Sequence, residues 1–488
     1  MKNFGKPLVR LRGGDSPASC HTHFYSPAPP ITDWPPEVAE TPEIVVVGAG
    51  LSGLTAAYRL RDRQVRVLEA GEAPGGVCLA GEYQGIRYPA GSAYFYYPST
   101  PAWQAWYQEL GLDLEDAALA APTSALFYKG RWFPDCFSQN GLRTLPLAPR
   151  ELEGLAGFAG DLAALEEQFD LLGAQELPHP ELDAISLAHY LEQVRGLSPE
   201  VTRIFTPYCR SCLGAGPEAI SALAAIYFLL SEISPTAASA AFPEGNTRIV
   251  QALLAALPRP PRLRQTVIQV KPGPDAVHLL VWDRATGDYY RLAAGAAVLA
   301  VGKFISRRLL TLECGWDPEV FRAFRYSSYL VAALGGAITP AAPGYENWVV
   351  GAETFTDFIL RPRTAAPGDP RVMVLFAPQP YPEGRAALLQ ARPEDQGREI
   401  LLDLERLFPG TAREVEEVHL YRFGHAQVVP YPGFLTHLKE RLQPRQGRII
   451  LAHSDMEGLP SIESAIVQGE QAARLARDVL EGKFEGGG

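Results

Sequence analysis

The chain has 488 residues, a net charge of −11, 47% apolar residues and 20% charged residues. This length predicts at least two domains, and the composition is typical of a folded globular protein. Because Lys and Arg residues are scattered and outnumbered by acidic residues, we expect no nucleic-acid partner.

The cysteines and the apolar runs indicate the cellular setting. Six cysteines are too few for a disulfide framework, and the pair Cys209 and Cys212 has no second pair or histidine cluster nearby to complete a zinc site. The longest apolar run, residues 220–230, is shorter than the roughly 20 residues that a membrane span requires. We therefore expect no metal, no transmembrane segment and, with no signal peptide visible, a cytoplasmic protein. An exported protein whose signal has been removed remains an alternative.

The first 42 residues are rich in proline and show no sustained hydrophobic period. Proline fixes φ and removes a backbone donor, so we expect an extended arm and not a domain. The pattern then changes, because residues 44–47 and 65–68 are apolar runs rich in β-branched residues, with a helix-like stretch between them. Such runs are typical of buried parallel strands.

From residue 100 to 241 the pattern is mostly helical. Pro101 and Gly111 bracket one expected helix, since proline is favoured just inside a helix start and glycine just past its end. The helices expected in this region cover residues 101–109, 149–169, 187–195 and 219–230.

Strands return in the second half of the chain, where residues 264–282 alternate between apolar and polar. Further strands are expected at 297–301, 372–376 and 448–452, and helices at 400–407 and 461–480. The last helix places its apolar and small residues on one stripe at helical spacing, which predicts one buried face.

A glycine-rich turn joins the first apolar strand to the helix after it. Its glycines, Gly48, Gly50 and Gly53, form the GxGxxG pattern that binds a dinucleotide. The first permits a tight turn, the second lets backbone approach a pyrophosphate, and the third lets the helix pack on the strand. Leu51 and Ser52 begin the helix, whose free N–H groups would face the phosphates.

An acidic residue ends the second strand. Glu69 stands near the spacing of about 20 residues at which a carboxylate accepts hydrogen bonds from a ribose diol, and Ala70 follows it. NAD and FAD use the same turn, so these residues alone do not choose between the two cofactors.

The run VVVGAGLSGLTAAYRL, followed by VRVLEAGEAPGG, resembles the superfamily of flavin-containing amine oxidases, protoporphyrinogen oxidases and phytoene desaturases. The resemblance implies FAD, and no cysteine follows Cys314 to link it covalently through the C-terminal segment. It also implies an α/β fold with a Rossmann-like FAD-binding domain built from discontinuous segments and a mixed α+β substrate domain with a helical part. We place the FAD-binding domain at 43–99, 242–312 and 445–482, and the substrate domain at 100–241 and 313–444.

The same resemblance implies further cofactor contacts. They are Gly75, Gly76 and Val77 after the ribose acid, Gly91 and Ser92 beside the ring, Val267 at the adenine, and Asp455, Ser461 and Ile462 in the C-terminal segment. Two departures affect these contacts, because Val77 stands where Arg is usual and His453 stands where Gly is usual.

Two residues are candidates for catalysis. Tyr94 belongs to an aromatic cluster expected near the flavin, although most of these rings are expected to pack in a core. His425 lies in a segment that runs toward the flavin in the superfamily, and a hydrogen-bonded structural histidine is the alternative.

We expect the enzyme to remove a hydride from a mainly apolar small molecule, with oxygen or another electron acceptor taking the electrons. Residues 326–331 lack the lysine, and residues 452–464 lack the aromatic ring, that many amine-oxidising members carry. The alternatives are an amine or amino-acid oxidase that produces peroxide, a redox-neutral double-bond isomerase, and a non-catalytic flavin-binding protein.

Overall fold

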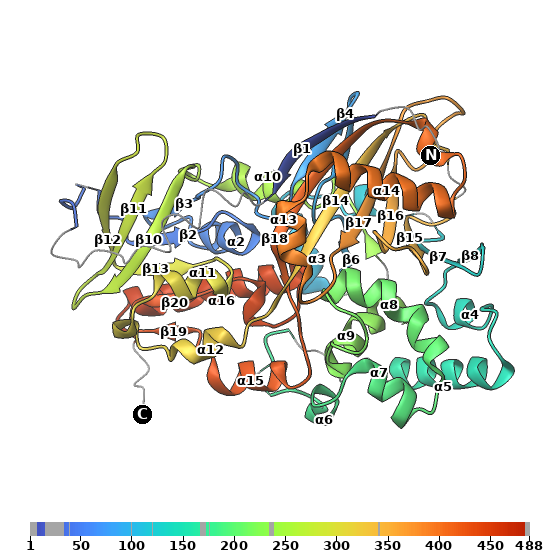
Figure 1. The fold of residues 1–488 in the computed structure, drawn as a ribbon. Helices are drawn as coiled ribbons and strands as arrows, with labels where there is room; N and C mark the ends of the chain where they lie inside the picture. The colour runs from blue at the N-terminus through green and yellow to red at the C-terminus, as the bar shows by residue number, and fades with distance from the viewer. Residues whose placement is uncertain are drawn as a thin grey trace. The chain divides into compact units, whose positions relative to one another are not determined.

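The computed structural model describes residues 7–14, 34–38, 40–98, 100–119, 121–165, 172–174, 176–233, 239–339 and 342–483. The chain forms two compact units (Figure 1). Unit 1 contains Met1–Asp15, Leu79–Thr247 and Tyr326–Thr436, and unit 2 contains Ser16–Cys78, Arg248–Arg325 and His437–Gly488. Residues 79–99 and 242–247 therefore group with unit 1, and the domain boundaries drawn from sequence stay a prediction.

Unit 2 is built on a five-stranded sheet with the order β19-β20-β13-β2-β3. Its strands are β2 (Ile44–Val47), β3 (Val65–Leu68), β13 (Ala296–Leu299), β19 (Arg445–Gln446) and β20 (Ile449–Leu451). All pairs are parallel except that between β19 and β20. The strands predicted at 44–47 and 65–68 are confirmed, and every residue of the apolar strands β2, β13 and β20 is buried.

Two helices pack together beside this sheet, α2 (Leu51–Arg59) and α16 (Ile462–Leu480). Gly469 makes their close approach possible, because a Cβ there would lie 2.6 Å from the backbone oxygen of Ser52. The buried stripe predicted for the last helix is confirmed.

An antiparallel three-stranded sheet completes the strands of unit 2. It contains β10 (Gln265–Pro272), β11 (Val277–Asp283) and β12 (Tyr289–Ala294). The chain before β10 pairs with the end of β3, since Glu69 N–H donates to the Arg262 oxygen at 2.8 Å. The helices here are α10 (Thr247–Ala256), which starts at the unit boundary, α11 (Lys303–Leu309) and α12 (Pro318–Arg322).

Unit 1 is built on an eight-stranded mixed sheet with the order β1-β18-β14-β17-β16-β15-β7-β8. Its strands are β1 (Leu8–Gly14), β7 (Ser124–Tyr128), β8 (Arg131–Pro134), β14 (Tyr326–Gly336), β15 (Glu346–Val349), β16 (Asp357–Arg361), β17 (Arg371–Pro378) and β18 (Val415–Val428). The strand predicted at 372–376 is confirmed within β17.

The central strand β14 is buried at every position because both faces of the sheet are covered. Alternate side chains point to opposite faces, so Leu330 and Ala332 join one core cluster while Tyr329 and Val331 join another. Helices α13 (Gly384–Gln390) and α14 (Pro393–Leu407) cover the first face (Figure 1), and the hairpin of β4 (Ala80–Tyr83) and β5 (Ile86–Pro89) lies against the second. Helix α14 begins before the expected residue 400.

The N-terminal arm contains regular structure that the sequence did not indicate. Strand β1 pairs in parallel with β18, with Val9 opposite Val418 and Leu11 opposite Leu420. Most of its side chains are exposed, so it carries no continuous apolar run, and its backbone is satisfied by a neighbour distant in sequence. Residues 15–33, with half of the prolines of the arm, lie outside the described residues.

The helical part of unit 1 contains helices in the predicted stretches and also the 15-residue helix α8, which the sequence analysis did not predict. The helix at 101–109 is confirmed, and Thr100 caps it by accepting from Trp103 N–H. The stretch predicted at 187–195 divides into a short α-helix and a π-helix. The elements are α3 (Pro101–Glu109), α4 (Gln139–Leu142), α5 (Pro149–Leu165), α6 (Pro180–Asp183), α7 (Leu187–His189), the π-helix Tyr190–Val194, α8 (Pro199–Leu213), α9 (Ala222–Ile233), and the paired strands β6 (Phe95–Tyr96) and β9 (Ser239–Ala240). The unit boundary falls within α15 (Phe434–Arg441).

Among the described residues, none of the helices is long and apolar enough to cross a membrane.

Candidate functional site

The turn after β2 requires glycine at the first and third glycine positions of its GxGxxG pattern. Gly48 has φ +100°, and a Cβ there would lie 2.6 Å from the Ala300 oxygen. A Cβ on Gly53 would lie 2.0 Å from the Gly48 oxygen, so α2 contacts the turn backbone directly. Gly50 differs, because the nearest atom to an added Cβ would be the Gly76 Cα at 3.9 Å. The space in front of Gly50 is therefore open to a group such as a pyrophosphate.

The second glycine pair lies beside this turn. Gly75 N–H donates to the Ala49 oxygen at 2.8 Å, and Gly50 and Gly75 form a parallel bridge. Gly75 and Gly76 both have positive φ, so the two segments present backbone to each other without side chains. Val77 is 46% exposed and has no group that could pair with a phosphate. The geometry fits a dinucleotide phosphate held by N–H groups and the start of α2.

Glu69 braces the same loops. Its Oε2 accepts from Ala49 N–H and its Oε1 accepts from Gly71 N–H, each at 2.7 Å. A carboxylate has about four lone-pair sites, so both oxygens can still accept from a ribose diol. The main-chain oxygen of Glu69 accepts from Gln265 N–H at the start of β10, the strand that carries Val267. Ala70 also has its oxygen bonded, by Arg284 at 2.7 Å.

The C-terminal segment reaches this turn through a buried polar group. Asp455 is buried, and its carboxylate accepts from Lys303 N–H at 2.9 Å and lies 3.1 Å from His453 Nδ1. His453 N–H donates to Ser52 Oγ at 3.0 Å, so the Ser52 side chain is engaged by protein. Ser461 caps α16 by accepting from Ser464 N–H at 3.1 Å, which places Ile462 in the first turn.

Fourteen of the predicted site residues thus lie in unit 2, and four lie in unit 1. In unit 1, Gly91 and Ser92 belong to a segment held by Asn246, whose Nδ2 donates to Ser92 Oγ at 2.7 Å and to the Tyr94 oxygen at 2.9 Å. Their contacts with a cofactor stay predictions.

Tyr94 lies beside a buried polar cluster of unit 1. Its hydroxyl is 3.3 Å from Cys212 Sγ on α8. Burial is the main cause that raises the pKa of Tyr94, and the nearby Cys212 and Glu346 raise it further. Next to Cys212, Ser211 Oγ is 2.7 Å from the Tyr329 hydroxyl. The predicted tyrosine therefore shares its surroundings with ionisable groups.

Three carboxyl groups of this cluster interact, Glu232 on α9, Glu346 on β15 and Asp357 on β16. Burial raises the pKa of Glu232 to about 8 and that of Asp357 to about 7. Burial, followed by the charges of Glu232 and Asp357, raises the pKa of Glu346 well above its usual range. Within the described part of the chain, both carboxyl oxygens of Glu346 lack a hydrogen-bond partner, and so does Oε1 of Glu232.

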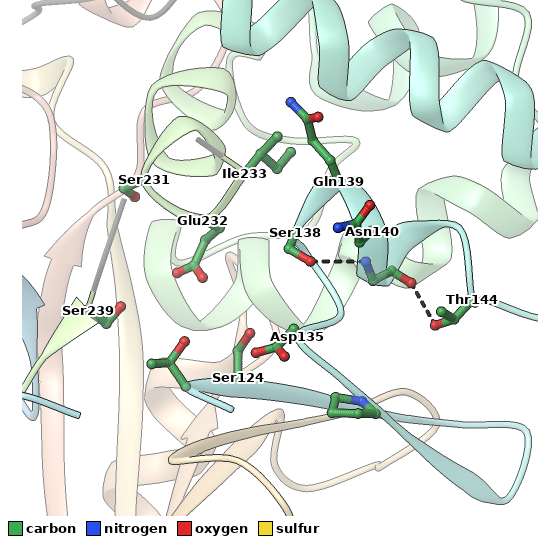
Figure 2. A pocket seen from close by; sticks show the side chains of 13 residues that line it. Ser124, Asp135, Ser138, Gln139, Asn140, Thr144, Ser231, Glu232, Ile233 and Ser239 are labelled. Atoms are coloured by element: carbon green, nitrogen blue, oxygen red, sulfur yellow. Dashed lines mark hydrogen bonds between the residues drawn. The ribbon is translucent and has the colours of Figure 1, made fainter. Parts of the chain in front are cut away.

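A cavity of about 610 Å³ lies beside Glu232, whose carboxyl group points toward the strand that carries Ser124 (Figure 2). Ser138 accepts from Gly141 N–H at 3.0 Å, and Thr144 donates to the Gly141 oxygen at 2.7 Å. Most of the lining is polar: Thr123, Ser124, Asp135, Ser138, Gln139, Asn140, Thr144, Ser231, Glu232 and Ser239.

His425 lies on β18, and the residue that its ring contacts is not the one that the Tyr94 hydroxyl contacts. Its ring centroid is 5.7 Å from that of Tyr326, edge to face, which is a packing contact. Its catalytic role stays a prediction.

Comparison with known proteins decides the family. The profile described as flavin containing amine oxidoreductase matches residues 51–477. The chain belongs to this family.

Individual relatives agree with this membership. A 62-residue stretch is 48% identical to Polyamine oxidase 1 of Oryza sativa subsp. japonica and covers 12% of each chain. Wild-type putrescine oxidase bound to putrescine has a similar fold, with TM-score 0.70 and 19% identity over 91% of this chain and 100% of that one. A CLA-producing fatty acid isomerase from P. acnes has a similar fold, with TM-score 0.65 and 15% identity over 92% of this chain and 100% of that one.

The family match confirms an FAD-dependent oxidoreductase with the expected α/β fold. Sequence reasoning missed several charged residues of this flavoenzyme. Lys303 stands four residues after the end of the buried strand β13, while Glu346 and Asp357 begin strands whose other residues are mostly apolar. A charged residue at or shortly beyond the end of an apolar strand was the available sequence signal, although most charged residues face solvent.

Proposed function

We propose that this flavoenzyme holds FAD without a covalent bond and oxidises an aliphatic amine. Buried carboxyl groups of unit 1 carry the proposal, and one of them, Asp357, already accepts from Thr356 Oγ1 at 2.7 Å. Glu346 is 1% exposed, and both of its oxygens lack a partner among the described residues. Such a group costs free energy unless a ligand satisfies it, so its presence favours a functional role.

A cationic substrate would satisfy these carboxyls. An ammonium group donates up to three hydrogen bonds and favours the ionised form of a carboxyl. Burial raises the pKa of Glu346 and of Asp357 and so favours their protonated forms. A bound cation would lower both pKa values and favour the carboxylates. In the carboxylate form that the cation favours, Asp357 is the group that would take a proton from the ammonium group.

The bound flavin would accept a hydride from the carbon next to nitrogen. The chain itself would orient the amine through Glu346 and remove its proton through Asp357. The Tyr94 hydroxyl, whose pKa is raised by burial, would stay protonated and donate a hydrogen bond. The resulting iminium would be hydrolysed by water, and oxygen or another acceptor would take the electrons.

Dehydrogenation of a mainly apolar substrate is the second candidate. It is supported by the absence of lysine from residues 326–331 and of aromatic residues from 452–464. Tyr88, Val331 and Phe376 belong to an extensive apolar and aromatic cluster of unit 1, which would suit such a molecule.

Anaerobic mixing separates these functions. We expect the flavin absorbance of the holoenzyme to bleach with aliphatic mono- or diamines and not with unsaturated lipids or terpenoids. Bleaching only with the apolar compounds would establish the second candidate, and product without net bleaching would indicate an isomerase. Flavin that no compound reduces would indicate a non-catalytic binding protein. Acid precipitation should release the flavin if the link is non-covalent.

Matched variants test the amine site. Glu346→Gln should raise the apparent dissociation constant for the amine at least tenfold, because a hydrogen bond to a charged group contributes about 1.5–3 kcal/mol. Glu399→Gln is the control, since Glu399 is exposed on α14. Equal amine affinity in both variants would contradict recognition by Glu346.

A further inference from the structure

Lys303 is a buried cation at the carboxyl edge of the parallel sheet of unit 2. It is the first residue of α11, four residues after the end of β13, and its side chain is fully buried. Its Nζ donates to the Val301 oxygen at 3.1 Å and to the Ala452 oxygen. These two carbonyls follow the neighbouring strands β13 and β20, so the ammonium joins the two strand ends.

The same lysine contacts the acidic residue of the C-terminal segment. Its backbone N–H donates to Asp455 Oδ2 at 2.9 Å. Burial lowers the pKa of Lys303 to about 8, and the Asp455 charge opposes that shift, so the ammonium is charged at neutral pH. A buried carboxylate and a buried ammonium thus balance each other.

His453 connects Asp455 to the dinucleotide turn through hydrogen bonds. Its φ of +99° with ψ of 148° lies in a region that is normally reserved for glycine and is strained in other residues. Two hydrogen bonds hold it there: Nδ1 accepts from Asp455 N–H at 3.3 Å, and the backbone N–H donates to Ser52 Oγ at 3.0 Å. Ser52 belongs to the first turn of α2, which follows Gly50.

We infer that Lys303 is a positioning residue for the flavin cofactor: it fixes Asp455 and His453 against the dinucleotide turn and balances the Asp455 charge there. The inference rests on FAD binding by unit 2. Removing the ammonium leaves two buried carbonyls without a donor and Asp455 without its countercharge. The C-terminal segment then loses the Nζ bond to the Ala452 oxygen, directly before His453, and a net negative charge remains near the site.

The experiment compares FAD-loaded wild type with Lys303→Met, Asp455→Asn and the double variant. For Lys303→Met we expect the FAD dissociation constant to rise at least tenfold and the flavin midpoint potential to become more negative, because uncompensated negative charge disfavours the reduced anion. Adding Asp455→Asn to Lys303→Met should bring the potential back toward that of wild type. Lys271→Met, on β10 of the same unit, is the control and should change neither quantity.

The inference would be overturned if Lys303→Met kept the wild-type FAD affinity and flavin potential. If only the melting temperature of the apoprotein fell, Lys303 would be a purely structural residue. If Lys303→Met does not fold, Asp455→Asn decides alone. It keeps the side-chain volume and should weaken FAD binding and make the potential more positive; no change would again overturn the inference. A wild-type protein that binds no FAD would instead reject the proposed function before any variant is compared.

Discussion

The two glycines Gly50 and Gly53 should respond to alanine in opposite ways, although they stand three residues apart. At Gly53 an added Cβ would lie 2.0 Å from the Gly48 backbone oxygen and 3.1 Å from Ala300 Cβ, and neither atom belongs to a flexible side-chain end. Helix α2 must therefore move away from β2. Overpacking of this kind costs about 1–3 kcal/mol, and a rigid backbone neighbour favours the upper end of that range.

At Gly50 the nearest atom to an added Cβ would be 3.9 Å away, and φ is −73°, which alanine adopts readily. The apoprotein should lose less than about 1 kcal/mol, the ordinary cost of a poorer N-cap residue. The methyl group would nevertheless occupy the space through which a pyrophosphate approaches the backbone. We expect Gly50→Ala to weaken FAD binding at least tenfold, which corresponds to about 1.4 kcal/mol.

Thermal unfolding of both apoproteins and titration with FAD measure the two effects. A unit of about 150–250 residues loses about 2–4 °C in Tm per kcal/mol, so Gly53→Ala should melt about 6–12 °C below wild type and Gly50→Ala less than about 4 °C below it. A Gly50→Ala protein that binds FAD as tightly as wild type would refute the assignment of the turn. An unchanged Tm in Gly53→Ala would refute the packing argument.

Three further changes test other parts of the molecule. Glu69→Gln should lower the apoprotein Tm and weaken FAD binding, because the amide has one acceptor oxygen, whereas the two carboxylate oxygens accept from Ala49 N–H and Gly71 N–H. Calorimetry and fluorescence titration measure the two effects, and wild-type values of both would contradict the bracing role. Because the folded pKa of Asp357 is raised from 3.8 to about 7, the folded state binds its proton more tightly than the unfolded state, so stability is lost as pH rises from about 4 to about 7. Apoprotein Tm should fall over that interval and fall less in Asp357→Asn; parallel curves would show that Asp357 does not contribute. Ser461→Ala removes the cap of α16 and should cost about 1 kcal/mol, measured by urea unfolding, whereas equal midpoints would show that the cap does not stabilise the helix.

Local patterns gave the parts of the fold that local chemistry controls. Strands 44–47 and 65–68 and the helix at 101–109 have the predicted bounds, because β-branched runs and a proline–glycine pair act over a few residues. The glycine spacing also identified the dinucleotide turn, since each glycine answers a steric demand within the same supersecondary unit.

Long-range pairing decided what the sequence did not reveal. Strand β1 is ordered by a free edge of β18, hundreds of residues away, and nothing in its own exposed pattern indicates that partner. Lys303 meets the Ala452 oxygen and Asp455 only because β13 and β20 are neighbours in the sheet. Glu232 and Glu346 interact because a helix end packs beside a strand distant in the chain. Sequence by itself therefore determined the cofactor-binding motif, whereas tertiary structure placed the buried charges, because the environment of a charge depends on segments that come together only when the chain folds.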